Sequence, residues 1–209
     1  MHLPGTRVLV CPVKLTKRGE YALRTLIQLG IAAQLGRDVV SVSQLAEIER
    51  LPFKFIENIL QELRRHGYVE SKRGKDGGAR LAKAPSEITI GEVVRLIDGR
   101  LAPIGCASET DYECCSCPDE QHCGLRMLMI DVRNAIARIL DKYTLLDVVD
   151  VTLKKMEQSG LSSSLMAAKA SGSGRKLAPT KPEAVLHANP LDGFLAMLNP
   201  VGPKTPPKS

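Results

Sequence analysis

The order of apolar and polar residues predicts a chain built mainly from helices. In six stretches, apolar residues recur at steps of three and four, which is the period of an amphipathic helix. Thr16 is placed to cap the first stretch, while SVSQ at 41–44 and TIGE at 89–92 have the capping-box pattern. The predicted helices span about 17–35, 42–50, 52–66, 89–97, 125–141 and 144–158.

The third predicted helix, 52–66, separates apolar from polar residues most sharply. Lys54, Glu57 and Asn58 lie on its polar face, where side chains could reach a partner. Phe55 fits either the core or a contact with a nucleic-acid sugar. The apolar stripe, which we expect in the core, consists of Phe53, Ile56, Ile59, Leu60 and Leu63.

A basic hairpin is predicted directly after this helix. Two short strand-like runs, 68–73 and 79–83, are joined by GKDGG at 74–78, whose residues tolerate positive φ. Helix, helix, turn, amphipathic helix and hairpin is the order of a winged helix-turn-helix. The predicted fold is therefore mainly α with a small β-wing. The basic residues of the hairpin are Lys72, Arg73, Lys75, Arg80 and Lys83.

A long helix is predicted at 125–141, with an apolar stripe too wide for one small neighbour to cover. Such a stripe suits packing across a dimer axis, so we expect a homodimer. Beyond about residue 160 the chain is rich in Ser, Gly and Pro and basic in charge. We expect 160–209 to be a disordered tail because it has too little apolar surface to fold.

The charge distribution indicates a polyanionic partner for the first half of the chain. Residues 13–85 contain 14 basic and 8 acidic residues, whereas residues 86–159 contain 8 basic and 13 acidic residues. A helix can enter the major groove of DNA, and a basic wing can follow its phosphates. Lys54, Glu57 and Asn58 are the candidates for base contacts. The wing candidates are Lys72, Arg73, Lys75 and Arg80.

Composition narrows the class of protein further. The chain has 209 residues, of which 44% are hydrophobic but only 3% aromatic, so an aliphatic core is expected. Neither a secretory signal nor an apolar run long enough to span a membrane is seen, and we expect a cytoplasmic protein. No nucleophile–base pairing or phosphate-binding loop points to an enzyme or to a small-molecule substrate.

Five of the six cysteines fall in one loop, at about 100–124. They are Cys106, Cys114, Cys115, Cys117 and Cys123. In a reducing cytosol such clustering favours a metal or redox site over disulfides. Soft thiolates suit an iron–sulfur cluster or zinc, but structural zinc usually shows two close Cys pairs and only one is present. Zinc and metal-free redox thiols remain alternatives.

These motifs together resemble the Rrf2 family of bacterial transcription regulators, over about 13–158. The resemblance is carried by KLTKRGEYALR at 14–24, the run 51–85, ITIGEVVRLIDG at 88–99 and the cysteine loop leading into CGLR at 123–126. It implies a homodimer that binds double-stranded promoter DNA, with an iron–sulfur cluster controlling its affinity. The expected role is a repressor that senses cluster status, nitric oxide or redox stress.

The resemblance also implies site residues. Cys106, Cys117 and Cys123 match the family's three-cysteine pattern best, which leaves Cys114 or Cys115 as a substitute or fourth ligand of a two-iron or four-iron cluster. Some members use a His three residues after the last Cys, where this chain has Arg126. Others use an acidic residue from the first helix of the partner subunit.

Three positions complete what the resemblance implies. Glu20 stands where those members have the acidic ligand, and Ser71 joins the wing residues. Members usually begin Met-(Lys/Arg)-Leu, and Val13 stands where that Met would be, so we interpret 1–12 as an extension before the true start. The expected domains are the winged domain 13–99, the cluster loop 100–124, the dimerisation helices 125–159 and the tail. A metal-holding scaffold without promoter specificity is the rival from another class.

Overall fold

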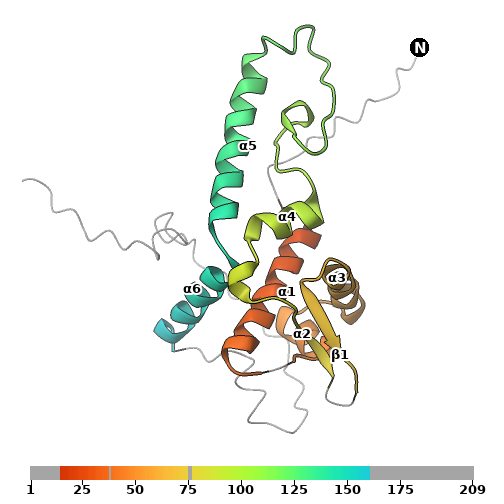
Figure 1. The fold of residues 1–209 in the computed structure, drawn as a ribbon, viewed down its shortest axis with the longest axis vertical. Coiled ribbons are helices and arrows are strands. Elements are labelled where there is room, and N and C mark those ends of the chain that lie inside the picture. Colours follow the sequence, from red (N-terminus) through yellow and green to blue (C-terminus); the bar gives the residue numbers. More distant parts are fainter. Residues whose placement is uncertain (1–14, 38, 75–76, 161–209) are drawn as a thin grey trace, which may run out of the picture. The chain divides into compact units, whose positions relative to one another are not determined.

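The computed structural model describes residues 15–37, 39–74 and 77–160 and confirms the six predicted helices (Figure 1). The helices are α1 Lys17–Gln34, α2 Val42–Glu49, α3 Phe53–Arg65, α4 Ile90–Asp98, α5 Gly124–Lys142 and α6 Leu145–Gln158. The predicted hairpin is formed by β1 Val69–Lys72 and β2 Gly78–Leu81. Two short 3-10 helices, η1 Pro85–Glu87 and η2 Gly105–Ala107, were not predicted.

The helix starts follow the capping residues seen in the sequence. The Thr16 hydroxyl accepts a hydrogen bond from the Gly19 amide at 3.0 Å and caps α1. Ser41 with Gln44, and Thr89 with Glu92, form reciprocal capping boxes at α2 and α4. Each cap satisfies amide groups that have no partner within the helix, so short sequence patterns suffice to fix these boundaries.

Helix α1 is the centre of the winged domain, and α2, α3, α4 and β2 all pack against it. Because these elements converge on one helix, α3 and the wing share a single aliphatic core. The core follows the predicted stripes of apolar residues. Its largest fully buried side chains include Leu26, Ile31, Leu45, Ile56, Ile59, Leu63, Ile88 and Val93.

Phe53 is an exception to the predicted stripe of α3. It was expected in the core, but 50% of its surface is exposed. Phe53 is the first residue of α3, and Phe55 makes the aromatic contact with α1 instead, its ring lying edge-on to Tyr21 with centroids 5.5 Å apart. The position of Phe53 was therefore predicted wrongly, because periodicity does not show where along a helix the packing partner begins.

The wing is a two-stranded antiparallel sheet in which Val69 pairs with Leu81 and Glu70 with Arg80. A further bridge joins Val40 to Ala79, so that the segment before α2 adds to the edge of the wing. Gly78 permits this approach, since a Cβ atom there would lie 2.4 Å from the Val40 carbonyl oxygen. The base of the wing is thus held to the rest of the domain by backbone hydrogen bonds.

The chain divides into two compact units, 1–148 and 149–209, with the boundary inside α6. In the first unit, α5 is tied to α4 by Arg95, whose guanidinium donates two hydrogen bonds, of 2.7 and 2.6 Å, to Asp141. The described part of the second unit is the rest of α6 and the turn after it. The predicted extension 1–12 and all of the predicted tail 160–209 except Gly160 lie outside the described residues.

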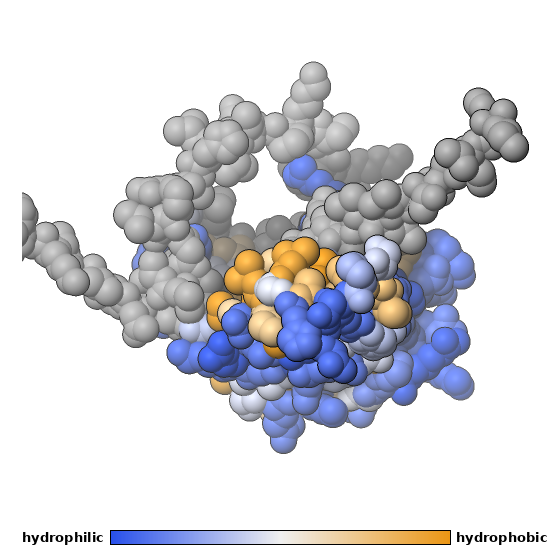
Figure 2. Space-filling view, turned by 90° about the horizontal axis from the view of Figure 1, so that it is seen from above, coloured by the Kyte–Doolittle hydropathy of each residue, from blue (hydrophilic) through white to orange (hydrophobic). Residues whose placement is uncertain are grey.

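Helix α5 has no buried residue in the single chain, although its apolar stripe is as predicted. Leu125, Leu128 and Ile139 are each at least half exposed. Seen from the end at which α5 begins, apolar side chains gather on the surface (Figure 2). None of the helices in the described ranges is long and apolar enough to cross a membrane.

Candidate nucleic-acid interface and metal centre

The polar face of α3 presents the three predicted base-reading residues to solvent. Lys54, Glu57 and Asn58 are all exposed, and the Lys54 ammonium lies 2.7 Å from the Glu57 carboxylate. On the opposite face, buried apolar side chains fix the helix against α1 and α2. The Arg18–Glu62 ion pair adds a second tie from α1 to α3. The polar face of α3 is therefore rigidly supported and open to solvent.

The cations of the wing differ in what they contact. Arg80 donates through Nε and Nη2 to the Glu70 carboxylate, at 3.0 and 2.8 Å. Lys72 and Arg73 are exposed and make no ion pair within the described part of the chain. Ser71 accepts a hydrogen bond of 2.8 Å from Arg64 of α3, which links the helix to the wing. Lys75 lies outside the described residues.

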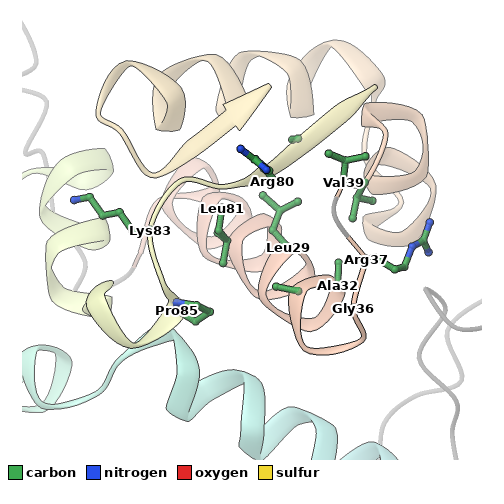
Figure 3. Close-up of a pocket in the computed structure, with 12 residues that line it drawn as sticks. Leu29, Ala32, Gly36, Arg37, Val39, Arg80, Leu81, Lys83 and Pro85 are labelled. Carbon is green, nitrogen blue, oxygen red and sulfur yellow. The ribbon is translucent and has the colours of Figure 1, made fainter. Parts of the chain in front are cut away.

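A cavity of about 280 Å³ lies at the base of the wing, between α1, the segment before α2 and β2 (Figure 3). Leu29, Ala32 and Leu81 point into it, whereas Arg37 and Lys83 turn their charged ends away. The Lys83 ammonium instead lies 4.9 Å from the centre of the Tyr68 ring. The cavity is thus lined by both apolar and polar groups, Arg80 among them, and neither Arg37 nor Lys83 directs its charged end into it.

The five cysteines of the loop are free thiols that differ in burial. Cys106 lies in η2 and is buried, Cys115 and Cys123 are half-buried, and Cys114 and Cys117 are exposed. Cys123 immediately precedes α5. The loop therefore joins η2 to the start of α5, with a cysteine at each end.

The crowding of these thiols disfavours their negative forms. Burial, and then the neighbouring Cys115, raise the pKa of the Cys106 thiol above its usual value. The hydrogen bond and charge of Cys115, with burial and Cys123, raise the pKa of Cys117 to about 11. Negative charge on one thiolate disfavours negative charge on a neighbouring thiol. A bound cation would reverse this effect, because metals take thiolates as ligands.

Cys114 is exposed, as Cys117 is, and its thiol donates to the Cys115 carbonyl oxygen at 3.4 Å. In the same part of the loop, Tyr112 donates to the Glu120 carboxylate at 2.6 Å, and this hydrogen bond is the main cause that raises the pKa of Tyr112.

Two arginines of α5 hold the start of the cysteine loop by its backbone. Arg126 donates to the Cys106 carbonyl oxygen at 2.9 Å and also pairs with Glu120 at 3.1 Å. Arg133 donates to the Ala107 carbonyl oxygen at 2.7 Å. Both guanidinium groups therefore link η2 to α5. The sequence did not predict these roles. It showed only that Arg126 stands where some family members have a His ligand.

The remaining candidate ligands have other partners in the single chain. Glu20 pairs with Lys17 at 2.8 Å and with Arg24 at 3.5 Å, and the hydrogen bond from Lys17 lowers the pKa of Glu20. His122 lies 2.8 Å from the Asp119 carboxylate through Nδ1. Glu20 and His122 thus contact charged side chains rather than the cysteine thiols.

A single metal ion would not find three ligands already in place here. Among the described residues, no three His, Cys, Asp or Glu side chains are grouped to hold one ion. An iron–sulfur cluster makes a different demand, because its cysteine ligands are distributed over several iron atoms. The cysteine loop contains five free cysteines, which fits that demand in donor type and number.

The fold and the exposed recognition face define a winged-helix protein of the transcription-regulator class. The sequence model of the Rrf2 family, described as an iron-dependent transcriptional regulator, matches residues 15–151. An rrf2-like HTH-type transcriptional regulator of Rhodobacter capsulatus is 37% identical over 139 residues, covering 65% of this chain and 91% of the relative. NsrR of Geobacillus kaustophilus is 36% identical over 138 residues, covering 66% and 90%.

Solved structures agree with this result. CymR of B. subtilis, described as the global cysteine regulator, has 28% identity and a TM-score of 0.55, covering 66% of this chain and 96% of that one. IscR of T. potens has 25% identity and a TM-score of 0.53, covering 74% and 96%. The chain belongs to the Rrf2 family.

Proposed function

We propose that this chain is a DNA-binding repressor whose affinity for promoter DNA depends on an iron–sulfur cluster in the cysteine loop. The observation that carries the proposal is the cysteine loop, which contains five free cysteines and whose start is held to α5 by Arg126 and Arg133. Cys106, Cys117 and Cys123 are the ligands that match the family pattern. Because promoter DNA lies in the bacterial cytoplasm, the protein would act there.

The DNA-binding part of the proposal rests on α3 and the wing. Lys54 and Asn58 can donate to base edges in the major groove, while Lys72 and Arg73 are available for phosphates. Ser71 is close to this surface, but its hydroxyl already accepts from Arg64. The Lys54–Glu57 pair must open, at least in part, if Lys54 is to reach a base.

The coupling of the loop to the winged domain follows contacts within the first unit. When bound, the cluster supplies redox-active iron, and its loss releases the thiols that had been its ligands. Arg126 and Arg133 connect the loop to α5, and Asp141 of α5 accepts from Arg95 of α4. Asp98 at the end of α4 accepts from the Thr16 amide at 2.9 Å, at the start of α1. A change in the loop can therefore bias the population of DNA-binding conformations.

The exposed apolar stripe of α5 supports a homodimer. A side chain such as Leu128, 55% exposed, gains about 1.5–3 kcal/mol when fully buried, so a partner helix would stabilise this surface. Pairing two chains would also place two recognition helices on one DNA duplex. Spacing between them would then decide whether both enter the major groove at once.

Anaerobic purification of the full-length protein tests the cluster directly. We expect a coloured protein with iron and acid-labile sulfide bound in comparable amounts. A colourless protein without iron would reject the cluster and favour a regulator based on thiols alone. Zinc in place of iron, without sulfide, would favour the structural-metal alternative. If the protein fails to bind DNA both with and without the cluster, the alternative of a metal-holding scaffold protein would be favoured.

A further inference from the structure

Phe53 is an exposed apolar side chain in a part of the surface that is otherwise polar. Half of its surface is accessible, although the sequence placed it in the core. Among the described residues between 42 and 81, it is the one large hydrophobic side chain that is exposed. The others that the described ranges contain lie before α1, in the cysteine loop or on α5. The exposure of Phe53 is therefore local to the start of α3.

The core of the winged domain does not need the ring of Phe53. Phe55, two positions later, supplies the aromatic contact to α1, with its ring centre 5.5 Å from that of Tyr21. The buried face of α3 is completed by Ile56, Ile59, Leu60 and Leu63. Burial of apolar surface is favourable, so the exposed half of Phe53 is available for contact with a partner.

The residues around Phe53 indicate which partner this is. Glu57 follows Phe53 by four positions, so the two lie one turn apart on the same face of α3. Lys54, next in sequence, is exposed as well. In a helix-turn-helix, residues near the start of the second helix contact base edges in the major groove. Phe53 is the first residue of α3 and would meet the bases together with these polar residues.

We propose that Phe53 contacts the C5-methyl group of a thymine in the major groove and thereby adds to the sequence specificity of this chain. The thymine methyl is the apolar group that base pairs present in this groove, and a phenylalanine ring can contact it. This inference rests on the proposed function, because it requires α3 to enter the groove. Lys54 and Asn58 would select bases by hydrogen bonds, and Phe53 by apolar contact.

Other DNA groups suit this side chain less well. Phosphate oxygens are charged and hydrated, and an apolar ring cannot replace the hydrogen bonds that they make with water. Stacking of an aromatic ring on a base requires an unstacked base, as in single strands. A contact with a deoxyribose would bury the ring but would not depend on the base. The thymine methyl is the contact through which Phe53 would affect specificity.

Replacement of thymine by deoxyuridine tests this contact, because uracil lacks the methyl group and keeps the same hydrogen-bonding groups. Footprinting with the full-length protein would locate its site in the DNA upstream of the gene. Each thymine of the site would then be replaced singly, and dissociation constants would be measured at fixed salt. We expect one thymine of a half-site at which the replacement weakens binding about fourfold, the effect of leaving one methyl group unburied.

Variants of Phe53 show whether this preference comes from its ring. Phe53→Ala should bind more weakly than the unsubstituted protein and should bind thymine and uracil equally at that position. Phe53→Leu, which keeps an apolar side chain, should retain part of the preference. The matched control is Arg73→Ala, which should weaken binding through the wing and keep the full preference. Because both DNAs are compared with the same variant, a change in the amount of folded protein affects both constants alike.

Two results would overturn the inference. One is a site in which no thymine replacement weakens binding, and a weaker Phe53→Ala would then place the ring on a sugar. The other is a preference for thymine that persists unchanged in Phe53→Ala. Absence of DNA binding by the unsubstituted protein would instead overturn the proposed function, so the two failures can be told apart.

Discussion

Arg73 and Arg80 lie on the same hairpin, but their guanidinium groups have different surroundings. Arg80 is opposite Glu70 in the strand register and is paired with it, whereas Arg73 is exposed beside the tip of the wing. A phosphate that approaches Arg80 must compete with a carboxylate. Arg73 has no such competitor among the described residues, so it is the better candidate for a phosphate contact.

Replacement of Arg73 by Ala should weaken DNA binding and also reduce its salt dependence. Removal of one phosphate contact lowers the slope of log affinity against log salt by about 0.9. Arg80→Ala should change the slope less, because Glu70 already offsets the charge of Arg80. Both slopes can be measured on the DNA upstream of the gene. An equal change for the two variants would contradict this distinction.

At the same scale, the sequence predicted contacts within one helix better than contacts between elements. Thr16 was predicted to cap the first helix, and its hydroxyl accepts a hydrogen bond from the Gly19 amide. The two phenylalanines of α3 could not be told apart in this way. Phe55 contacts Tyr21, which lies on a different helix, and Phe53 is exposed. Such contacts depend on where the helices cross, which periodicity leaves open.

At the scale of elements, Gly78 decides how closely the wing approaches the segment before α2. A Cβ atom there would lie 2.4 Å from the Val40 carbonyl oxygen, which is backbone and cannot rotate away. We expect Gly78→Ala to lower the free energy of unfolding by about 1–3 kcal/mol. Gly124→Ala is the control, because nothing lies within 4 Å of its added Cβ atom. Equal losses of stability for Gly78→Ala and Gly124→Ala in urea unfolding would contradict this role.

The Arg95–Asp141 pair should make the attachment of α5 to α4 depend on pH. The hydrogen bond from Arg95 lowers the pKa of Asp141 below its usual value. The pair therefore stabilises the folded state above the pKa of the unfolded carboxyl, about 3.9, and this contribution is lost as the pH falls through the lower folded value. Both side chains are partly exposed, so its size is about 0.5 kcal/mol.

The variant Asp141→Asn measures this contribution. Its free energy of unfolding should lie below that of the unsubstituted protein at pH 7, and the difference should shrink between about pH 5 and pH 3. Urea unfolding at several pH values gives the comparison. A difference that stayed constant over this range would show that the carboxylate charge is not its cause.

Most elements of the fold follow from local sequence, whereas the architecture of the loop does not. Thr16, Ser41 with Gln44, and Thr89 with Glu92 cap their helices as predicted, because each cap involves residues three positions apart. Arg126 reaches back 20 positions to Cys106. No periodic pattern encodes such a contact, so the sequence located the cysteine loop but not the contacts that hold it to α5.

At the scale of the whole molecule, the apolar stripe of α5 is the surface on which a dimer would depend. Leu128→Glu places a charge on this stripe, and a buried, unpaired charge is costly at an interface. We expect light scattering to give the molar mass of a monomer for this variant. It should also bind DNA at least tenfold more weakly than the unsubstituted protein does. Gln34→Glu, which adds the same charge at an exposed position of α1, should remain dimeric.

The most direct test of the central claim is the affinity of one anaerobic preparation for the DNA upstream of its gene, at fixed salt, before and after removal of the cluster. If the cysteine loop controls the recognition helices, the dissociation constant should change by about 5- to 150-fold, which is the range of a typical coupling free energy. The change should reverse when the cluster is restored. Equal dissociation constants with and without the cluster would contradict the account.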